Sequence, residues 1–422
     1  MFALSIALAA TIAAQSATLT LADAVDAALR DNPGLAAETQ AAAPLRQRAA
    51  QVEALPPPMV EAQIWRWPIT TLNPARVDMY MFMGSQAFPA RGWRDAAGAA
   101  ARLDAEAAST AVAVTARDVA EQVTDAYADL YVARRARAVY SRTLDTLRQL
   151  GDASVARYAT ATLGQGDVLK SVVELSRLEQ DLIDLGERER RAEIRLATLM
   201  GRDPGSPVEP LADPPRLPQA LDPVALTALA EAEVPELRAA EARRAAAEAH
   251  RDLTALERKP SWSVSAGYML MPGKAGAWSA GVGVSWPQAP WSRGRLDALE
   301  AERDAGVKAE EARLAALRQQ VRAGVQDALA SLDSARARVA LIRTTVLPQA
   351  RQTLEVSRIG YGAGQVAFLD VIDNQRTELD VALGLIEAEG RVLDATARLE
   401  RAVGVSLSEP RVIAALAAAG ER

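Results

Sequence analysis

Two long stretches of the chain mix apolar and charged positions and contain almost no proline. Residues 90–203 contain no proline, and residues 292–408 contain only Pro348. Because proline is the strongest helix breaker, both stretches predict long, nearly continuous helices. A helix over about 95–157 would be about 95 Å long at 1.5 Å per residue. Such a helix must pack along a partner as a coiled coil.

Two shorter segments, about Met59–Pro89 and Ser261–Pro287, have the pattern of strands. Within them, Val264–Met269 and Ala280–Trp286 alternate small or polar residues with larger ones. Aromatic residues crowd these segments, as in the interfacial girdles of membrane β-barrels. The alternative is two soluble hairpins with aromatic cores. All seven tryptophans lie in or beside them: Trp65, Trp67, Trp93, Trp262, Trp278, Trp286 and Trp291.

The two halves of the chain repeat one plan. Tyr158 aligns with Tyr361, and the match continues without a gap to Gly201 and Gly404, through identical aspartate, leucine and arginine positions. In each half a helical stretch precedes the hairpin. A long helix, a break near the aligned tyrosine and a returning helix follow it. The pattern predicts an internal duplication.

The predicted fold class is mainly α with a small β part, in two tandem repeats that each begin with a helix. Its segments are a signal peptide (1–17); a first repeat (18–203, with a β-hairpin at 59–89 and a long helical hairpin at 95–201); a Pro-rich linker (204–222); a second repeat (223–406, with a β-hairpin at 261–287 and a long helical hairpin at 292–404); and a C-terminal tail (407–422).

The apolar run Phe2–Ala14, followed by Gln15-Ser16-Ala17, resembles a secretory signal. The alternative is the first helix of a cytoplasmic scaffold. No run of 18 apolar residues follows, so no transmembrane helix is predicted. A secreted chain can still cross a membrane as a β-barrel. Two hairpins supply four strands, whereas a barrel needs about eight, so several chains would have to share one barrel.

The amino-acid composition argues against a catalytic role for this chain. It has no cysteine and one histidine, His250, so thiolate and most zinc or hydrolytic sites are excluded. The net charge of −6 and the lack of a basic cluster argue against nucleic-acid binding. No nucleophile–base pair is evident. Gly360, Gly362 and Gly364 could suggest a nucleotide-binding loop, but they follow a helix rather than a strand, which indicates a turn. We expect no enzyme activity, no cofactor and no metal site.

Several short motifs, in order along the duplicated chain, resemble the TolC-type outer-membrane efflux factor family. The sequences of these motifs are closer to those of the heavy-metal branch of the family than to those of its drug-export branch. The resemblance covers essentially the whole mature chain. The motifs are Leu19–Ala24, Ala28–Pro33, Phe88-Pro89, Trp286-Pro287, Val346–Ala350, Tyr361–Gly364 and Phe368–Asp373.

The resemblance implies a homotrimer with a shared twelve-stranded β-barrel in the outer membrane. Its helices would form a tunnel across the periplasm. A periplasmic adaptor (membrane fusion) protein and an inner-membrane pump would be its partners, besides outer-membrane lipid. The channel would passively export small molecules or metal ions that the pump delivers. The rival interpretation is a periplasmic coiled-coil adaptor or scaffold without a transmembrane barrel.

The resemblance also implies roles for single residues. Asp370 and Asp373 would line the periplasmic aperture, where a ring of carboxylates favours cations. The alternative is that they cap a helix start. The hairpin tips would dock the adaptor, and the tryptophans would form the membrane girdle. The docking candidates are Tyr158, Gly164, Asp167, Tyr361 and Gly364, and the girdle candidates are Trp65, Trp67, Trp262, Trp278 and Trp286.

Two further features favour plain structural interpretations. Met79, Met81 and Met83 alternate along one strand face, and methionine binds soft metals such as Cu(I). We favour lipid-facing or barrel-packing roles for them. His250 lies on an Ala/Glu/Arg-rich helix without a second histidine, which favours a surface or packing role over metal binding.

Overall fold

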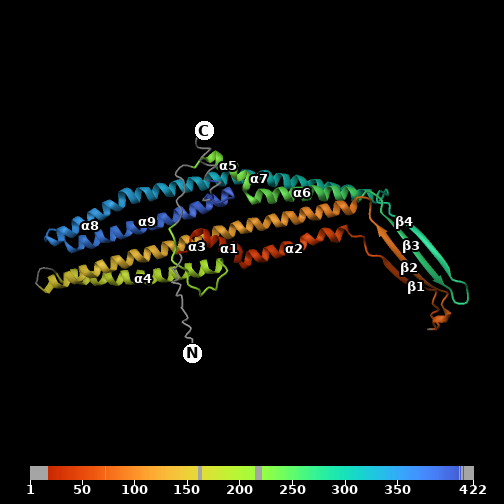
Figure 1. The fold of residues 1–422 in the computed structure, drawn as a ribbon, viewed down its shortest axis with the longest axis horizontal. Coiled ribbons are helices and arrows are strands. Elements are labelled where there is room, and N and C mark those ends of the chain that lie inside the picture. Colours follow the sequence, from red (N-terminus) through yellow and green to blue (C-terminus); the bar gives the residue numbers. More distant parts are fainter. Residues whose placement is uncertain are drawn as a thin grey trace, which may run out of the picture. The chain divides into compact units, whose positions relative to one another are not determined.

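The computed structural model describes residues 18–71, 73–159, 164–213, 221–407, 409 and 412 of the 422-residue chain. The predicted signal peptide, part of the linker and most of the C-terminal tail lie outside them. The described chain is mainly helical with one small antiparallel sheet, as the sequence predicted (Figure 1). Its elements are α1 (Leu21–Asp31), α2 (Pro33–Glu53), β1 (Met59–Trp65), η1 (Pro74–Arg76), β2 (Met79–Phe88), α3 (Trp93–Ala159), α4 (Gln165–Leu199), α5 (Pro223–Glu233), α6 (Pro235–Leu256), β3 (Trp262–Leu270), β4 (Ala277–Val284), α7 (Arg293–Leu341), η2 (Ile342–Val346), α8 (Leu347–Gly362) and α9 (Phe368–Val403).

The chain divides into two compact units. The first unit contains Met1–Ala36, Thr115–Val234 and Val321–Arg422. The second contains Ala37–Val114 and Pro235–Gln320, and therefore all four strands.

The helical stretch that the sequence predicted before each hairpin consists of two helices. Asn32 separates α1 from α2, and Val234 separates α5 from α6. Both residues are extended, with ψ of 120° and 118°. Each precedes a proline, whose ring disfavours the helical conformation of the residue before it. The prolines themselves are tolerated because they open the following helices.

A π-helical turn interrupts the long helix predicted after the second hairpin. The turn η2 lies between α7 and α8, and the N–H of Leu347 donates to the carbonyl of Ile342, five residues back. Pro348 follows at once. Proline has no N–H, and its ring crowds the carbonyl four residues earlier, so a regular α-helix cannot pass through it undisturbed.

The four strands of the second unit form one antiparallel sheet in the order β1-β2-β3-β4 (Figure 1). β1 and β4 are therefore its two edge strands. Successive side chains of a strand point to opposite faces, so the register assigns every residue to a face. Phe82, Tyr268 and Trp278 are paired across three strands and share one face.

That face, which we call the aromatic face, is apolar and open. The opposite face, which we call the polar face, carries small, polar and methionine side chains such as Glu61, Gln63 and Ser265. The exposed large side chains of the aromatic face are Val60, Ile64, Phe82, Trp262, Val264, Tyr268, Leu270, Trp278, Val282 and Val284.

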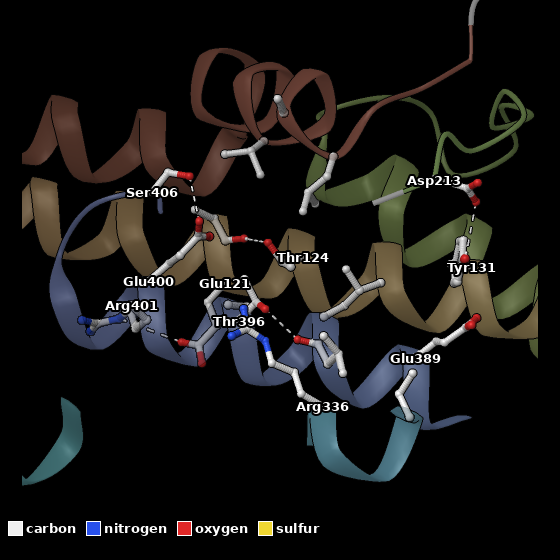
Figure 2. Close-up of a pocket in the computed structure, with 18 of the residues that line it drawn as sticks. Glu121, Thr124, Tyr131, Asp213, Arg336, Glu389, Thr396, Glu400, Arg401 and Ser406 are labelled. Carbon is white, nitrogen blue, oxygen red and sulfur yellow. Dashed lines mark hydrogen bonds and ion pairs between the residues drawn. The ribbon is translucent and has the colours of Figure 1, made fainter. Parts of the chain in front are cut away.

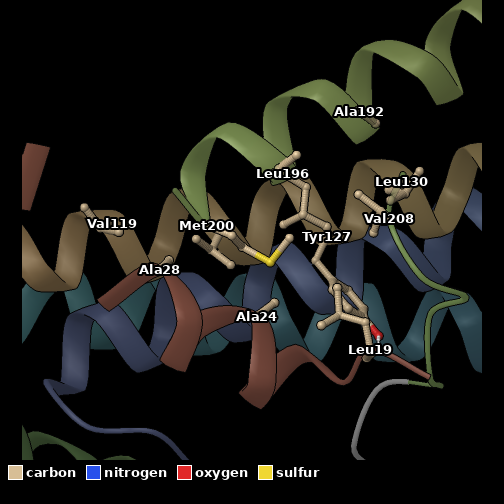
Figure 3. Packing of buried hydrophobic residues seen from close by; sticks show 13 residues of the cluster. Leu19, Ala24, Ala28, Val119, Tyr127, Leu130, Ala192, Leu196, Met200 and Val208 are labelled. Carbon is tan, nitrogen blue, oxygen red and sulfur yellow. Dashed lines mark hydrogen bonds between the residues drawn. The ribbon is translucent and has the colours of Figure 1, made fainter. Parts of the chain in front are cut away.

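A buried cluster in the first unit joins α1, α3 and the end of α4 (Figure 3). Tyr127 of α3 is fully buried in it, and its hydroxyl lies 3.0 Å from the carbonyl oxygen of Leu19 and 2.7 Å from that of Ala212. Leu19 also forms a parallel bridge with Leu211. Thr20 and Asp23 form a capping box at the N-terminus of α1. One tyrosine thus ties the segment before α1 to the segment after α4.

Two glycines of the first unit pack against backbone where no side chain fits. Gly201 after α4 and Gly404 after α9 have φ of 71° and 88°. A Cβ on Gly201 would overlap the carbonyl of Asp31, and a Cβ on Gly404 would lie 2.8 Å from the backbone nitrogen of Val234. These are also the two glycines that the sequence duplication aligned.

We expect Gly201→Ala to lower the free energy of unfolding by about 2 kcal/mol or more. Its left-handed backbone costs about 1–2 kcal/mol for any residue with a Cβ, and the overlap with Asp31 adds to this. Gly186→Ala within α4 is the matched control, because a Cβ there meets no atom within 4 Å and alanine favours helix. Thermal denaturation of both variants measures the difference. Equal melting temperatures would contradict this packing.

Candidate functional site

The second helical hairpin turns tightly between α8 and α9. Gly364 adopts a left-handed φ of 77°, and its N–H donates to the carbonyl of Tyr361 at 3.1 Å. Gln365 donates to Gly360 at 2.8 Å, which completes the helix end. The ring of Tyr361 is buried against Phe368, 5.6 Å away between centroids. Gly364 is therefore exposed at the turn, whereas Tyr361 lies inside the hairpin.

Asp370 and Asp373 lie in the first turns of α9, and both are exposed. Neither is the N-cap, since that position is Ala367 and makes no side-chain cap hydrogen bond. In α4 the N-cap is likewise Gly164, three residues before Asp167. None of the three aspartates is therefore the N-cap residue. Asp370 and Asp167 lie in the first turns of their helices, where an acidic side chain interacts favourably with the helix dipole.

An ion pair that the sequence analysis missed joins the two hairpins. Arg376 of α9 donates through Nε to Glu174 of α4 at 2.8 Å and through Nη2 to the second carboxylate oxygen. The Glu174 side chain is only 6% exposed. This hydrogen bonding raises the pKa of Arg376. Asp373 also approaches Arg376, at 3.7 Å, so one of the predicted gate carboxylates contacts this pair.

A shared apolar core surrounds this pair. It contains side chains of α3, α4, α8 and α9, so the two helical hairpins of the first unit pack directly on each other. Its buried members are Leu144, Leu147, Leu178, Leu354, Tyr361, Phe368, Val371, Ile372 and Leu379.

The first hairpin tip differs from the second. Tyr158 is 47% exposed, whereas the aligned Tyr361 is buried. Gly164 opens α4 with an extended backbone, φ −79°, and not with the left-handed one of Gly364. Large apolar side chains are exposed near both tips: Val155 and Tyr158 on α3, Leu169, Val172 and Val173 on α4, Val356 and Ile359 on α8, and Leu369 on α9.

A cavity of about 1150 Å³ opens in the first unit between α1, α3, the end of α7 and α9 (Figure 2). Its lining combines both charges, including Glu121, Arg336 and Glu400. Burial is the main cause that raises the pKa of Glu121 and of Glu400. Glu400 accepts hydrogen bonds from the Ser406 hydroxyl at 2.8 Å and from the Leu407 N–H at 2.7 Å. Two other pairs of charges lie in the same lining, Arg401 with Glu121 at 3.9 Å and Arg343 with Glu389 at 2.6 Å, as in a structural network.

Acidic groups of α3 and α9 face one another in the same unit. Burial, followed by the charges of Asp125 and Asp129, raises the pKa of Asp394 to about 6. Burial also raises the pKa of Asp125, while Arg195 and Arg398 lower it. Asp394 therefore loses its proton at a higher pH than an exposed aspartate does.

The tryptophans of the second unit lie towards the two ends of the sheet. Trp262 stacks on Phe88 at 4.3 Å at the end near the helices, and Trp286 follows β4 at the same end. Trp278 contacts Tyr268 nearer the opposite end, at 5.0 Å. Trp65 ends β1 opposite Met79, so its register places it on the polar face. Trp67 follows β1, and its indole N–H donates to the carbonyl of Thr71 at 2.9 Å.

His250 of α6 lies 3.0 Å from the carboxylate of Asp104 on α3, which is an interhelical pairing. Among the described residues, no group of three or more His, Cys, Asp or Glu side chains is arranged to hold a metal ion. No helix in the described ranges is both long enough and apolar enough to span a lipid bilayer.

The ion pair between the hairpins should contribute to stability. Arg376→Met leaves the buried Glu174 without its partner, and we expect a loss of about 2 kcal/mol, reduced from the fully buried case because Arg376 is partly exposed. The double variant Glu174→Met with Arg376→Met should recover much of this loss. Urea unfolding of the single and double variants gives the coupling energy. Additive effects would contradict a direct pair.

Comparison with known proteins finds a family match for the second half of the chain. Residues 226–405 match the family described as "Outer membrane efflux protein". The cobalt-zinc-cadmium resistance protein CzcC of Cupriavidus metallidurans is 25% identical over 319 residues, which cover 74% of each protein.

Solved structures share the fold. The outer-membrane channel OprN has a TM-score of 0.76 at 21% identity, over 92% of this chain and 91% of that one. The outer membrane protein VceC from Vibrio cholerae has a TM-score of 0.74 at 18% identity, over 92% of this chain and 97% of that one. Outer-membrane efflux, which the motifs predicted, is what the family description states. The predicted resemblance is thus confirmed: residues 226–405 match the efflux-protein family, and the chain is similar to CzcC and to solved outer-membrane channels.

Proposed function

We propose that three copies of this chain form a channel through the outer membrane and a tunnel into the periplasm. The channel passively exports solutes that an inner-membrane pump delivers through a periplasmic adaptor, and the chain itself carries out no reaction. One observation supports this most strongly: the sheet has two open edge strands and one exposed apolar face.

The open edges require further strands. β1 and β4 each present a row of backbone N–H and C=O groups to no neighbouring strand in the described chain. Such groups cost several kcal/mol each in lipid unless they are paired, so only closed barrels are stable there. Four strands are too few to close. Three copies would supply twelve and would pair β4 of one chain with β1 of the next.

The aromatic face carries two rows of large side chains, as two girdles would require. The row of Phe88, Trp262 and Val284 lies six residues along β2 from the row of Phe82, Tyr268 and Trp278. At about 3.3 Å per residue the two rows are about 20 Å apart along the strand, or about 15 Å along the membrane normal at a strand tilt of about 40°, which fits within the ~25 Å apolar band of outer-membrane barrels. We propose Trp262 and Trp286 for one girdle and Trp67 and Trp278 for the other. Trp65, on the polar face, fits a girdle less well.

A tandem duplication accounts for the paired features of the two halves. Asn32 and Val234 each precede a proline and interrupt equivalent helical stretches. Gly201 packs against the backbone of Asp31, next to the first interruption, and Gly404 packs against the backbone of Val234 at the second. We propose the repeats as 18–203 and 223–406, joined by the segment 204–222.

The tip of the second hairpin is the proposed periplasmic aperture. Asp370 and Asp373 are exposed there, and a trimer would place six carboxylates around one opening. The exposed apolar side chains of both tips, with Tyr158, Gly164, Asp167 and Gly364, form the proposed adaptor-docking surface. Tyr361 is buried, so its role would be to shape the turn. A metal ion is the favoured cargo, because the relative CzcC is named for cobalt, zinc and cadmium resistance.

The rival function is a periplasmic coiled-coil adaptor or scaffold without a barrel. Such a protein would expose the aromatic face to water. Contiguous exposed apolar patches of this extent are rare on monomeric soluble proteins.

Lysine substitutions on opposite faces of β3 test the barrel. We expect Val264→Lys, on the aromatic face, to reduce the outer-membrane trimer strongly, because a charge on the lipid face costs about 2–4 kcal/mol near the midplane. Ser265→Lys on the polar face is the matched control and should assemble normally. Membrane fractionation, detergent extraction and native mass determination provide the readout. A soluble monomer for the unaltered chain, or equal assembly of both variants, would reject the barrel.

The aperture is tested by single-channel recording. We expect Asp370→Asn with Asp373→Asn to lower the preference of the channel for cations over anions, because a carboxylate ring attracts cations. Asp380→Asn, also exposed on α9 but further from the turn, is the control. An unchanged cation preference in the double variant would place the selective constriction elsewhere.

A further inference from the structure

Five methionines lie on the polar face of the sheet, and four of them gather on its two central strands. Met81 of β2 lies directly opposite Met269 of β3 in the register. Met79 and Met83 lie two residues to either side of Met81 on β2, and therefore on the same face. β2 and β3 are the two central strands of the sheet (Figure 1). Met79, Met81 and Met83 lie close together in the sequence, whereas Met269 comes from the second hairpin, so only the strand pairing brings it to the other three.

In the proposed barrel, the register places these side chains on the face away from lipid. Tyr80 and Phe82, which alternate with them, belong to the aromatic face. The methionines instead share their face with Gln63, which is opposite Met81 on β1, and with Glu61, which is opposite Met83. All four methionines are half-buried there, whereas Phe82 is 50% exposed on the other face.

The spacing allows the thioethers to converge. Directly opposite residues have Cβ atoms about 4.5–5.5 Å apart, and diagonal neighbours are about 7–8 Å apart. Methionine is unbranched and has three rotatable side-chain bonds, so neighbouring sulfur atoms can turn towards one point. Thioethers are soft ligands that select Cu(I) over harder cations. The carboxylate of Glu61, on the adjacent strand, supplies a negative charge next to the cluster.

We propose that Met79, Met81, Met83 and Met269 form a binding site for a soft monovalent metal cation, Cu(I) or its heavier congener Ag(I). The Met81–Met269 pair is its centre. The site is complete within one chain, so binding does not depend on the proposed trimer. Its place inside a channel does rest on the proposed function, in which the polar face would line the lumen.

The test is a titration of the full chain, purified in detergent, with Ag(I) in chloride-free nitrate buffer. Isothermal titration calorimetry should give about one Ag(I) for each chain. We expect Met81→Leu with Met269→Leu to weaken binding by at least tenfold. Leucine conserves the volume and apolarity of methionine, so the fold should persist, which circular dichroism checks. Met200→Leu is the matched control, since Met200 is buried in the apolar cluster of the first unit and lies outside the sheet.

X-ray absorption of the Cu(I)-loaded chain gives a second readout. We expect sulfur neighbours around copper in the unaltered protein and in Met200→Leu, and fewer in the double variant. The proposal is overturned by any of three results: no binding by the unaltered chain, equal binding by the double variant, or a coordination shell of nitrogen and oxygen only.

The oligomeric state of the same samples separates this proposal from the channel. A trimer that binds no Ag(I) would overturn the metal site and leave the barrel standing. A soluble monomer that binds Ag(I) through Met81 and Met269 would support the metal site and reject the barrel.

Discussion

The unpaired edges of the four-stranded sheet are the constraint on which the remaining interpretation depends. β1 and β4 leave backbone donors and acceptors open, and the face between them is apolar. In water such a sheet exposes a large apolar patch, and in lipid it exposes unpaired backbone. Identical sheets that join edge to edge into a closed barrel pair their backbone groups, and lipid around such a barrel covers the apolar face. The sheet therefore explains why a chain with so much helix is proposed to work only as an oligomer.

The helical hairpins of the first unit meet a different requirement. Each is far too long for a single compact core, so each must find contacts along its length. Their tips are joined by a shared apolar core and by the ion pair of Glu174 with Arg376. The exposed Asp373 contacts the same arginine. A change in the charge of Asp373 at the proposed aperture therefore acts directly on the ion pair that joins the two hairpins.

Much of the fold could be predicted because helix and strand signals here are long and local. The absence of proline predicted the long helices, and alternation with aromatic clustering predicted both hairpins. The breaks at Asn32 and Val234 were also readable in principle, since each precedes a proline. The π-helical turn before Pro348 was not, because a proline inside a helix can equally produce a kink or an end.

The candidate site was less predictable because its contacts are long-range. Glu174 aligns with Thr377 in the duplication, so the repeat gave no hint of the pair with Arg376. The buried Tyr361 and exposed Tyr158 also differ, although they align. The methionines depend on strand register, and a slip of one residue would move a strand's side chains to the other face. Only the pairing of Phe82 with Tyr268 and of Met81 with Met269 settles which face is aromatic and which carries sulfur.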